Sequence, residues 1–285
     1  MIWLIGNRGM LGTELSNLME YLNIPYIGTD RDVDITNPDA LNGYADNKQI
    51  KYIINCAAYT AVDKAEDDVA NCEKLNNLGA SNIAIFSKNI QARFVHISTD
   101  YVFDGTASVP YKEDDLVNPI GVYGRTKRDG ETAILKSNPN SYIIRTAWLY
   151  GRYGNNFVST MIKLMNERPE LKVVNDQKGS PTWAYDLSRI IIEFVKTGIP
   201  FGIYHYSNEG SITWYDFACE IYRQGKELGL INNNCSIKPC TSAEFPSKVK
   251  RPNYSVLDKG KIKLMLNISI PQWQDSLREY LCQFQ

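Results

Sequence analysis

Residues 1–12 read MIWLIGNRGMLG, and this stretch decides the fold. The apolar run Ile2–Ile5 predicts a buried strand, and glycines with G-x-x-G-x-x-G spacing follow it directly. Glycines between a strand and a helix allow a tight turn, and the backbone N–H groups at the helix start can hold a pyrophosphate. We therefore predict a dinucleotide-binding loop built from Gly6, Asn7, Arg8, Gly9, Met10, Leu11 and Gly12.

Short apolar runs alternate with segments of helical periodicity, which predicts an α/β fold with a doubly wound parallel sheet of Rossmann type. The predicted strands are Ile2–Ile5, Tyr26–Thr29, Tyr52–Ala57, Arg93–Ser98, Tyr142–Thr146 and Gly202–Ser207. The predicted helices are Thr13–Leu22, Asn71–Asn89, Tyr123–Leu135, Phe157–Arg168, Ala184–Lys196, Trp214–Leu228 and Pro271–Phe284.

The composition of the sequence changes after residue 150, where Trp, Tyr and Pro become denser. We predict an NAD(P)-binding domain over residues 1–150, rejoined by residues 184–207. Residues 151–183 and 208–285 would form a smaller, mixed α/β substrate-binding lobe that closes over the carboxyl ends of the strands.

Charge and cysteine content narrow the class of protein. The chain carries 31 Lys and Arg against 32 Asp and Glu, which is typical of neither a nucleic-acid surface nor an acidic tail. Its six cysteines form no C-x-x-C pair, so we expect free thiols and no metal site. No apolar run approaches the roughly 20 residues that span a bilayer. We expect a soluble cytoplasmic protein that binds neither nucleic acid nor membrane.

Asp30 ends the second predicted strand, about 20 positions beyond the loop, where an acidic residue can hold the adenosine ribose hydroxyls. Its carboxylate would repel a 2′-phosphate and favour NADH, whereas Arg8 and Arg31 could clamp that phosphate and favour NADPH. Asp30 could also be a simple turn residue. The sequence leaves the choice of cofactor open.

Tyr123 and Lys127 lie on one face of a predicted helix because they are four residues apart. A phenol titrates near pH 10, and a neighbouring ammonium favours the phenolate, so we expect Lys127 to lower the pKa of Tyr123 and make it a usable proton donor. Ser98-Thr99-Asp100 follows a buried strand. With the glycine loop, these residues predict a nicotinamide-dependent enzyme that acts on a carbonyl or an alcohol.

Further segments extend this pattern over nearly the full length. They are NCAAYTAVDKAE (55–66), STDYVFDG (98–105), VYGRTK (122–127), RTAW (145–148), GNNF (154–157), NDQKGSPT (175–182) and RPNYS (251–255). On these segments the chain resembles the extended short-chain dehydrogenase/reductases and, within them, the dTDP-4-dehydrorhamnose reductase family. The Tyr/Lys pair and the glycine loop are shared by the whole superfamily, whereas the second, sixth and seventh segments are more particular to this family.

The resemblance implies reduction of the 4-keto group of dTDP-4-dehydro-L-rhamnose to dTDP-L-rhamnose by NADPH or NADH. By the same resemblance, Tyr123 donates the proton, Lys127 holds the nicotinamide ribose, and Thr99 hydrogen-bonds the reacting oxygen. The implied cofactor contacts, beyond the loop, are Asp30, Arg31, Asp34, Ile35, Ala57, Ala58, Tyr59, Tyr123 and Lys127. The implied substrate contacts are Thr99, Asp100, Tyr101, Trp148, Asn156 and Arg251.

Several of these residues have simpler interpretations. Thr99 could cap the segment after its strand, Trp148 could be a packing residue, and Arg251 could pair with an acidic residue. His96 lies within a predicted strand, where we expect a structural histidine with satisfied hydrogen bonds. We expect the same of His205, which alternates with tyrosines in another predicted strand.

Two features bear on assembly and on function. Some family members bind magnesium at a dimer interface through glutamates, but Tyr185 stands where one of these is expected, although Glu14 matches another. We therefore predict no metal, and either a monomer or a homodimer.

The alternative functions are a reductase of another nucleotide-linked 4-ketohexose, a non-catalytic NADP-binding regulatory subunit, and a sugar epimerase or dehydratase of the same superfamily.

Overall fold

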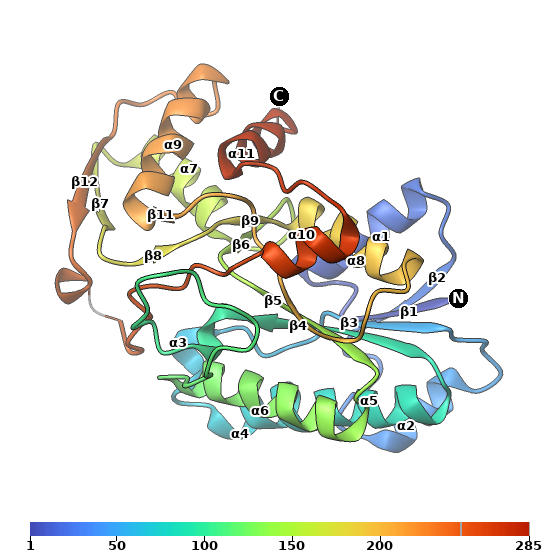
Figure 1. Ribbon diagram of the computed structural model, residues 1–285. Coiled ribbons are helices and arrows are strands. Elements are labelled where there is room, and N and C mark those ends of the chain that lie inside the picture. Colours follow the sequence, from blue (N-terminus) through green and yellow to red (C-terminus); the bar gives the residue numbers. More distant parts are fainter. Residues whose placement is uncertain (246, 285) are drawn as a thin grey trace.

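The computed structural model describes residues 1–245 and 247–284, and a six-stranded parallel sheet forms its centre (Figure 1). The strand order is β10-β5-β4-β3-β1-β2, and each neighbouring pair is parallel. This confirms the predicted fold class. The strands are β1 (Ile2–Ile5), β2 (Tyr26–Thr29), β3 (Tyr52–Asn55), β4 (Arg93–Thr99), β5 (Ser141–Thr146) and β10 (Gly202–His205).

Helices cover both faces of the sheet because each strand is apolar on both sides (Figure 1). Ile2 and Leu4 of β1 pack into the core under α1 and α8, whereas Trp3 and Ile5 point to the opposite core, under α2 and α5. The first layer contains α1 (Met10–Tyr21), α8 (Ala184–Lys196) and α10 (Gly260–Leu266). The second contains α2 (Pro38–Ala45), α4 (Val69–Glu73), the π-helical turn η1 (Lys74–Gly79), α5 (Ala80–Asn89) and α6 (Val122–Ser137).

Most of the remaining elements gather around a separate core that contains Phe217, Trp273 and Leu277, whereas α3 and η2 pack into two smaller clusters beside the sheet. Its long helices are α7 (Phe157–Glu167), α9 (Trp214–Glu227) and α11 (Trp273–Cys282). The shorter elements are α3 (Val62–Ala65), η2 (Asp100–Val102), β6 (Leu149–Tyr150), β7 (Glu170–Val174), β8 (Lys178–Gly179), β9 (Thr182–Trp183), β11 (Ile212–Thr213), β12 (Ser236–Cys240) and η3 (Ser242–Glu244). Between these elements the chain returns to the main sheet through β10, as the apolar run at 202–207 predicted. The exact division into a cofactor domain and a substrate lobe stays a prediction.

The predicted helix over Asn71–Asn89 differs from the structure in one respect. The helical path is continuous, but η1 interrupts the α-helical hydrogen bonding between α4 and α5. A π turn accommodates an extra residue and so rotates the side chains around it. As a result Leu78, which follows Leu75 at helical spacing, is 48% exposed, while Asn76 is buried.

Two predicted boundaries also move for local reasons. The strand predicted over Tyr52–Ala57 ends at Asn55, whose side chain accepts a hydrogen bond from the N–H of Ala57 and turns the backbone away. The first helix begins at Met10, earlier than predicted, because Gly9 already serves as its N-cap.

The sheet order creates a switch point at β1. From β1 the chain passes to β2 on one side and afterwards to β3 on the other, so the connections at the carboxyl ends of β1 and β3 diverge to opposite faces. Crevices at such points are where ligands bind in open α/β sheets.

Gly130 and Gly43 provide a matched test of helix packing. A Cβ on Gly130 of α6 would lie 2.1 Å from the backbone oxygen of Asn76, whereas one on Gly43 of α2 meets nothing within 4 Å. We expect Gly130→Ala to lower the free energy of unfolding by about 1–3 kcal/mol through overpacking. Gly43→Ala should raise it by about 0.5–1 kcal/mol. Urea denaturation of both variants measures this, and equal effects would contradict the close packing of α6 on η1.

Candidate active site

The glycine loop packs tightly against the loop that follows β3. Gly6 has φ +79°, and a Cβ there would lie 2.6 Å from the backbone nitrogen of Ala57. A Cβ on Gly12 would lie 2.0 Å from the oxygen of Gly6. Within the described residues no side chain caps the start of α1 at Gly9, so its first N–H groups stay available for an anion.

The side chains of the loop have different surroundings. Arg8 is exposed, Asn7 packs beside Gly28, Leu11 is buried in the core under α1, and Met10 packs against the edge of that core. The loop therefore offers backbone groups and one exposed guanidinium to a ligand.

Charges of both signs lie at the end of β2. The N–H of Asp30 donates to the carboxylate of Asp32 at 2.7 Å. That bond is the main reason that the pKa of Asp32 is lowered, and the backbone N–H of Asp32 and the nearby Arg8 add to it. Arg31 is exposed at the same turn. The end of β2 therefore brings together Asp30, which would favour NADH, and the arginines Arg8 and Arg31, which would favour NADPH.

Asp34 and Ile35 are engaged within the fold. Asp34 accepts hydrogen bonds from the backbone and the hydroxyl of Thr36, at 2.9 and 2.7 Å. Ile35 is 4% exposed and packs against Gly79 of η1. A role for these two residues at the adenine stays a prediction.

The predicted cofactor segment Ala57-Ala58-Tyr59 is fixed to the opposite layer by Asn76. The amide of Asn76 accepts from the N–H of Tyr59 at 2.8 Å and donates to its carbonyl at 3.1 Å. It also donates to the hydroxyl of Thr126, beside Lys127, at 3.1 Å. The π turn therefore holds the loop after β3 against the helix that carries the Tyr/Lys pair.

Thr99, Asp100, Tyr101 and Tyr123 meet at the carboxyl end of β4. The Thr99 hydroxyl donates to Asp100 at 3.1 Å and accepts from the N–H of Tyr101 at 3.2 Å, so it does cap η2. The rings of Tyr101 and Tyr123 pack edge to face with centroids 5.6 Å apart. Burial raises the pKa of Asp100 to about 6 and that of Tyr101 to about 12.

The predicted effect of Lys127 on Tyr123 is wrong for this arrangement. The pKa of Tyr123 is raised, chiefly by burial, and the neighbouring Thr99 side chain opposes the shift. The lysine Nζ instead bonds to His96 Nε2 at 3.1 Å and to the carbonyl of Ile97 at 2.6 Å. Burial lowers the pKa of Lys127 to about 8, while Glu131 acts in the opposite direction.

A buried ion pair lies behind the Tyr/Lys helix. Glu131 on α6 and Arg145 on β5 approach to 2.7 Å, with side chains only 4% and 3% exposed. The Ser98 hydroxyl donates to Glu131 at 2.5 Å, and the guanidinium lies over the ring of Phe103 at 5.1 Å. The pair joins α6 to β4 and β5.

The substrate residues predicted from the second half of the chain already have protein partners. Trp148, at φ +47°, stacks on Trp214 with centroids 3.5 Å apart. Asn156 caps α7 by accepting from Ser159. Arg251 pairs with Asp63 at 3.2 Å. The packing and pairing interpretations therefore describe Trp148 and Arg251 in this structure, and their substrate roles stay predictions.

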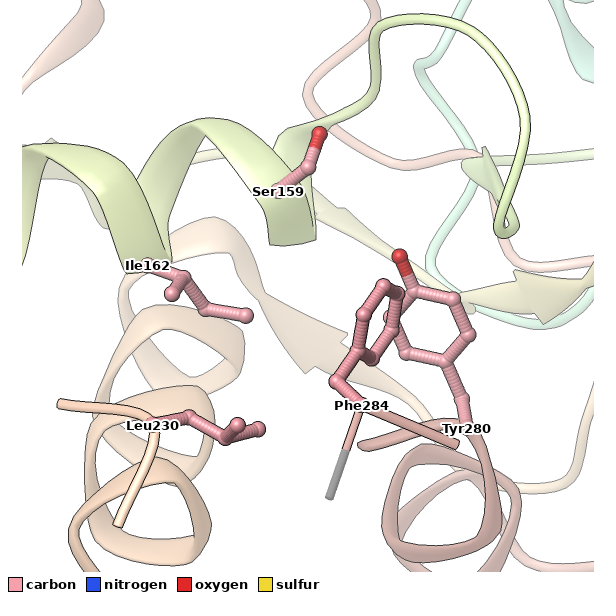
Figure 2. A pocket seen from close by; sticks show the side chains of 5 residues that line it. All are labelled: Ser159, Ile162, Leu230, Tyr280 and Phe284. Atoms are coloured by element: carbon pink, nitrogen blue, oxygen red, sulfur yellow. The ribbon is translucent and has the colours of Figure 1, made fainter. Parts of the chain in front are cut away.

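The described residues outside this site bear on the predictions about metals and membrane spans, and they line a cavity. The described part of the chain brings no three His, Cys, Asp or Glu side chains together to hold a metal. It also holds no helix long and apolar enough to cross a bilayer. A cavity of about 200 Å³ beside α7 and α11 (Figure 2) contains none of the predicted site residues; its lining is Ser159, Ile162, Leu230, Tyr280 and Phe284.

Sequence patterns missed Asn55, Asn76 and Glu131. His96 is a buried histidine whose two ring nitrogens have hydrogen-bond partners, as expected, but its contact with Lys127 was not predicted. Glu131 had a local signal, because it lies four residues after Lys127 on the same helix face. The other three reach the site through contacts between distant segments and left no such signal.

The glycine loop at the switch point, together with the Tyr/Lys pair and Thr99, defines the class of nicotinamide-dependent short-chain dehydrogenase/reductases. The family model "RmlD substrate binding domain" matches residues 1–285. The chain belongs to this family, that of the dTDP-4-dehydrorhamnose reductases, as its sequence segments predicted.

Three relatives illustrate the match. A dTDP-4-dehydrorhamnose reductase of Aggregatibacter actinomycetemcomitans is 37% identical, over 96% of this chain and 95% of that protein. A dTDP-4-keto-6-deoxy-D-glucose reductase of Streptomyces niveus is 40% identical, over 90% and 88%. The solved dTDP-4-dehydrorhamnose reductase of Bacillus anthracis, in complex with NADP, is 35% identical with a TM-score of 0.93, over 99% of this chain and 98% of that chain.

The raised pKa of Asp100 makes a stability prediction. An ionised carboxylate is disfavoured at this buried position, so its folded-state pKa of about 6 exceeds the ordinary value of 3.8. The contribution of Asp100 to the free energy of unfolding is most favourable at pH values below its ordinary pKa of 3.8, and it is lost as pH rises through about 6. We expect the free energy of unfolding, relative to Asp100→Asn, to fall by about 3 kcal/mol over this range. Urea denaturation at several pH values tests this, with the exposed Asp114→Asn as a control that should follow the wild type.

Proposed function

We propose that this chain reduces the 4-keto group of dTDP-4-dehydro-L-rhamnose to dTDP-L-rhamnose with NADPH or NADH. One observation carries the proposal: in a member of this family, the phenol of Tyr123 lies beside Thr99 and packs against the ring of Tyr101 at the carboxyl end of β4. The glycine loop, which closely approaches Ala57, lies at the switch point at β1, and β3 lies between β1 and β4 in the sheet.

The glycine loop fits a dinucleotide. Backbone atoms lie so close to Gly6 and Gly12 that only glycine allows this tight turn, and the turn leaves the start of α1 open to a phosphate. When bound, the reduced nicotinamide supplies a hydride to carbon 4 of the sugar. Ala57, Ala58 and Tyr59 would line this cofactor, with Lys127 at the nicotinamide ribose. The match to a relative in complex with NADP supports nicotinamide binding.

Tyr123 has the protonation state that a proton donor needs. Because its pKa is raised, the phenol keeps its proton near neutral pH. As hydride reaches carbon 4, negative charge develops on the attached oxygen, and a donor placed there stabilises the transition state. Tyr123 would give this oxygen its proton, with Thr99 as a second hydrogen-bonding group.

Arg251 is our candidate for the diphosphate of the substrate. Its guanidinium contacts Asp63 through one nitrogen, and its buried Nε has no partner among the described residues. Arginine binds phosphate oxygens through paired donors. Asp100, Tyr101, Trp148 and Asn156 would complete the substrate site. We further propose a cytoplasmic monomer or homodimer.

A reductase of another nucleotide-linked 4-ketohexose is the second candidate, favoured by the similarity to the Streptomyces niveus protein. The two differ in the sugar that turns over, so both sugars belong in the same assay.

Tyr123→Phe tests the proposed mechanism. With dTDP-4-dehydro-L-rhamnose and either NADPH or NADH, we expect kcat to fall by about 100- to 10,000-fold, because general acid catalysis is lost. Binding of NADPH should stay within about twofold, since the ring is retained. Nicotinamide absorbance measures turnover. Tyr26→Phe, at a partly exposed tyrosine of β2, is the control and should keep full activity.

The outcomes separate the candidate functions. Unchanged turnover in Tyr123→Phe would contradict the proposed proton donor. Turnover only of dTDP-4-keto-6-deoxy-D-glucose would favour the second candidate, and cofactor binding without any turnover would favour the regulatory subunit.

Arg251→Gln tests the diphosphate contact. We expect KM for the nucleotide sugar to rise about 10- to 100-fold with kcat little changed, because hydrogen bonds to a charged group are lost in ground and transition states alike. Lys248 lies three residues before Arg251 and is an exposed cation that pairs with Asp67. The control Lys248→Gln should leave KM unchanged. Equal effects of both substitutions would mean that Arg251 contributes only general positive charge.

A further inference from the structure

A chain of hydrogen bonds joins the cofactor loop to Lys127. The N–H of Ala57 donates to Asn55 Oδ1 at 3.0 Å, and Asn55 Nδ2 lies 3.1 Å from His96 Nδ1. His96 Nε2 lies 3.1 Å from Lys127 Nζ, which donates to the carbonyl of Ile97 at 2.6 Å. Asn55, His96 and Lys127 are each 1% exposed, so bulk solvent does not compete for these hydrogen bonds.

The direction of the chain is fixed at its first bond. The backbone N–H of Ala57 can only donate, so the oxygen of the Asn55 amide faces it and the NH2 group faces His96. His96 Nδ1 must then accept. A neutral imidazole carries one proton, which therefore lies on Nε2 and points at Lys127.

The last bond determines the state of the lysine. An ammonium has three donors and no acceptor, so it would oppose the N–H of His96. A neutral amine has a lone pair that accepts from His96, and it still donates to Ile97. For the ammonium to form without a clash, His96 must carry its proton on Nδ1, which breaks the bond from Asn55.

We propose that His96 and Asn55 are positioning residues that set the charge of Lys127, holding it as a neutral amine until the His96 proton moves from Nε2 to Nδ1. The proposal rests on the proposed function for the role of Lys127, and it makes the charge of the site depend on the Ala57 loop. Protonation then takes up one proton from solvent at Nζ.

The surroundings of Lys127 act on its charge in both directions. Burial is the largest influence and lowers its pKa to about 8; Glu131 on α6, Cys56 after β3 and Cys72 on α4 act in the opposite direction. Glu131 is itself neutralised by Arg145. Burial and Lys127 lower the pKa of His96 well below its usual range, so the imidazole is neutral.

The two histidines of the chain provide the first test. His205 Nδ1 lies 3.1 Å from the carbonyl of Tyr111, which only accepts, while its Nε2 faces Arg145. His205 should therefore be the Nδ1–H tautomer, opposite to His96. Nitrogen-15 NMR of the full chain labelled at histidine distinguishes the two forms, and His205→Gln assigns the signals. An Nδ1–H tautomer or an imidazolium at His96 in the pH range above the pKa of Lys127, which is about 8, would overturn the proposal.

Asn55→Ser provides the second test without changing charge. It frees His96 to accept from an ammonium, so the pKa of Lys127 should rise. If the ammonium is the active form, kcat/KM falls as pH rises through this pKa, and the fall should move to higher pH by about one unit, or tenfold in proton affinity. Asn138→Ser, at a buried asparagine at the far end of α6, is the matched control and should not move it.

An unmoved pH profile in folded Asn55→Ser would overturn the proposal. Failure of the proposed function would look different: no dTDP-4-dehydro-L-rhamnose would be reduced at any pH, but the histidine spectra would still report the tautomers. The pH dependence would then be measured as the Kd of NADPH in the wild type and in Asn55→Ser, with the same expected shift.

Discussion

The buried ion pair between Glu131 and Arg145 is the constraint on which the rest of the site depends. Each charge alone would cost several kcal/mol at this depth, so neither residue tolerates loss of its partner. Because the pair also engages Ser98, it fixes α6 against β4 and β5 at one point. Glu131 lies one helical turn beyond Lys127 and opposes the effect of burial on its charge. Both the placement of Tyr123 and the electrostatics of its neighbour follow from this pair.

The fold was largely accessible from sequence because parallel strands buried on both faces appear as continuous apolar runs. Ile2–Ile5 and the glycines after it located the first strand, the loop and the start of α1. The π turn was not accessible, because Leu75 and Leu78 repeat at ordinary helical spacing. Its selection depends on contacts between distant segments, such as the approach of Gly130 to Asn76.

The candidate site divides in the same way. Tyr123 and Lys127 were recognisable since their relation is local, and the family segments pointed to Thr99 and Asp100. Asn55 and His96 were not recognisable as partners of Lys127, because β3 and β4 bring them together only in the folded sheet. The direction of the Tyr123 pKa shift was mispredicted for a related reason. Helical spacing suggests proximity to a cation, but the degree of burial, which dominates, is a property of the whole structure.

The π turn also constrains the length of the chain. It accommodates one residue more than a regular helix would, and one residue corresponds to about 100° of rotation about the helix axis. Cys72 of α4 and Ile83 and Phe86 of α5 are all buried. A single deletion within Lys74–Gly79 would rotate α5 relative to α4, so that these side chains could no longer all face the core. Substitution at the exposed Leu78 leaves this register intact. In this segment the number of residues is therefore under stronger structural constraint than the identity of those that face solvent.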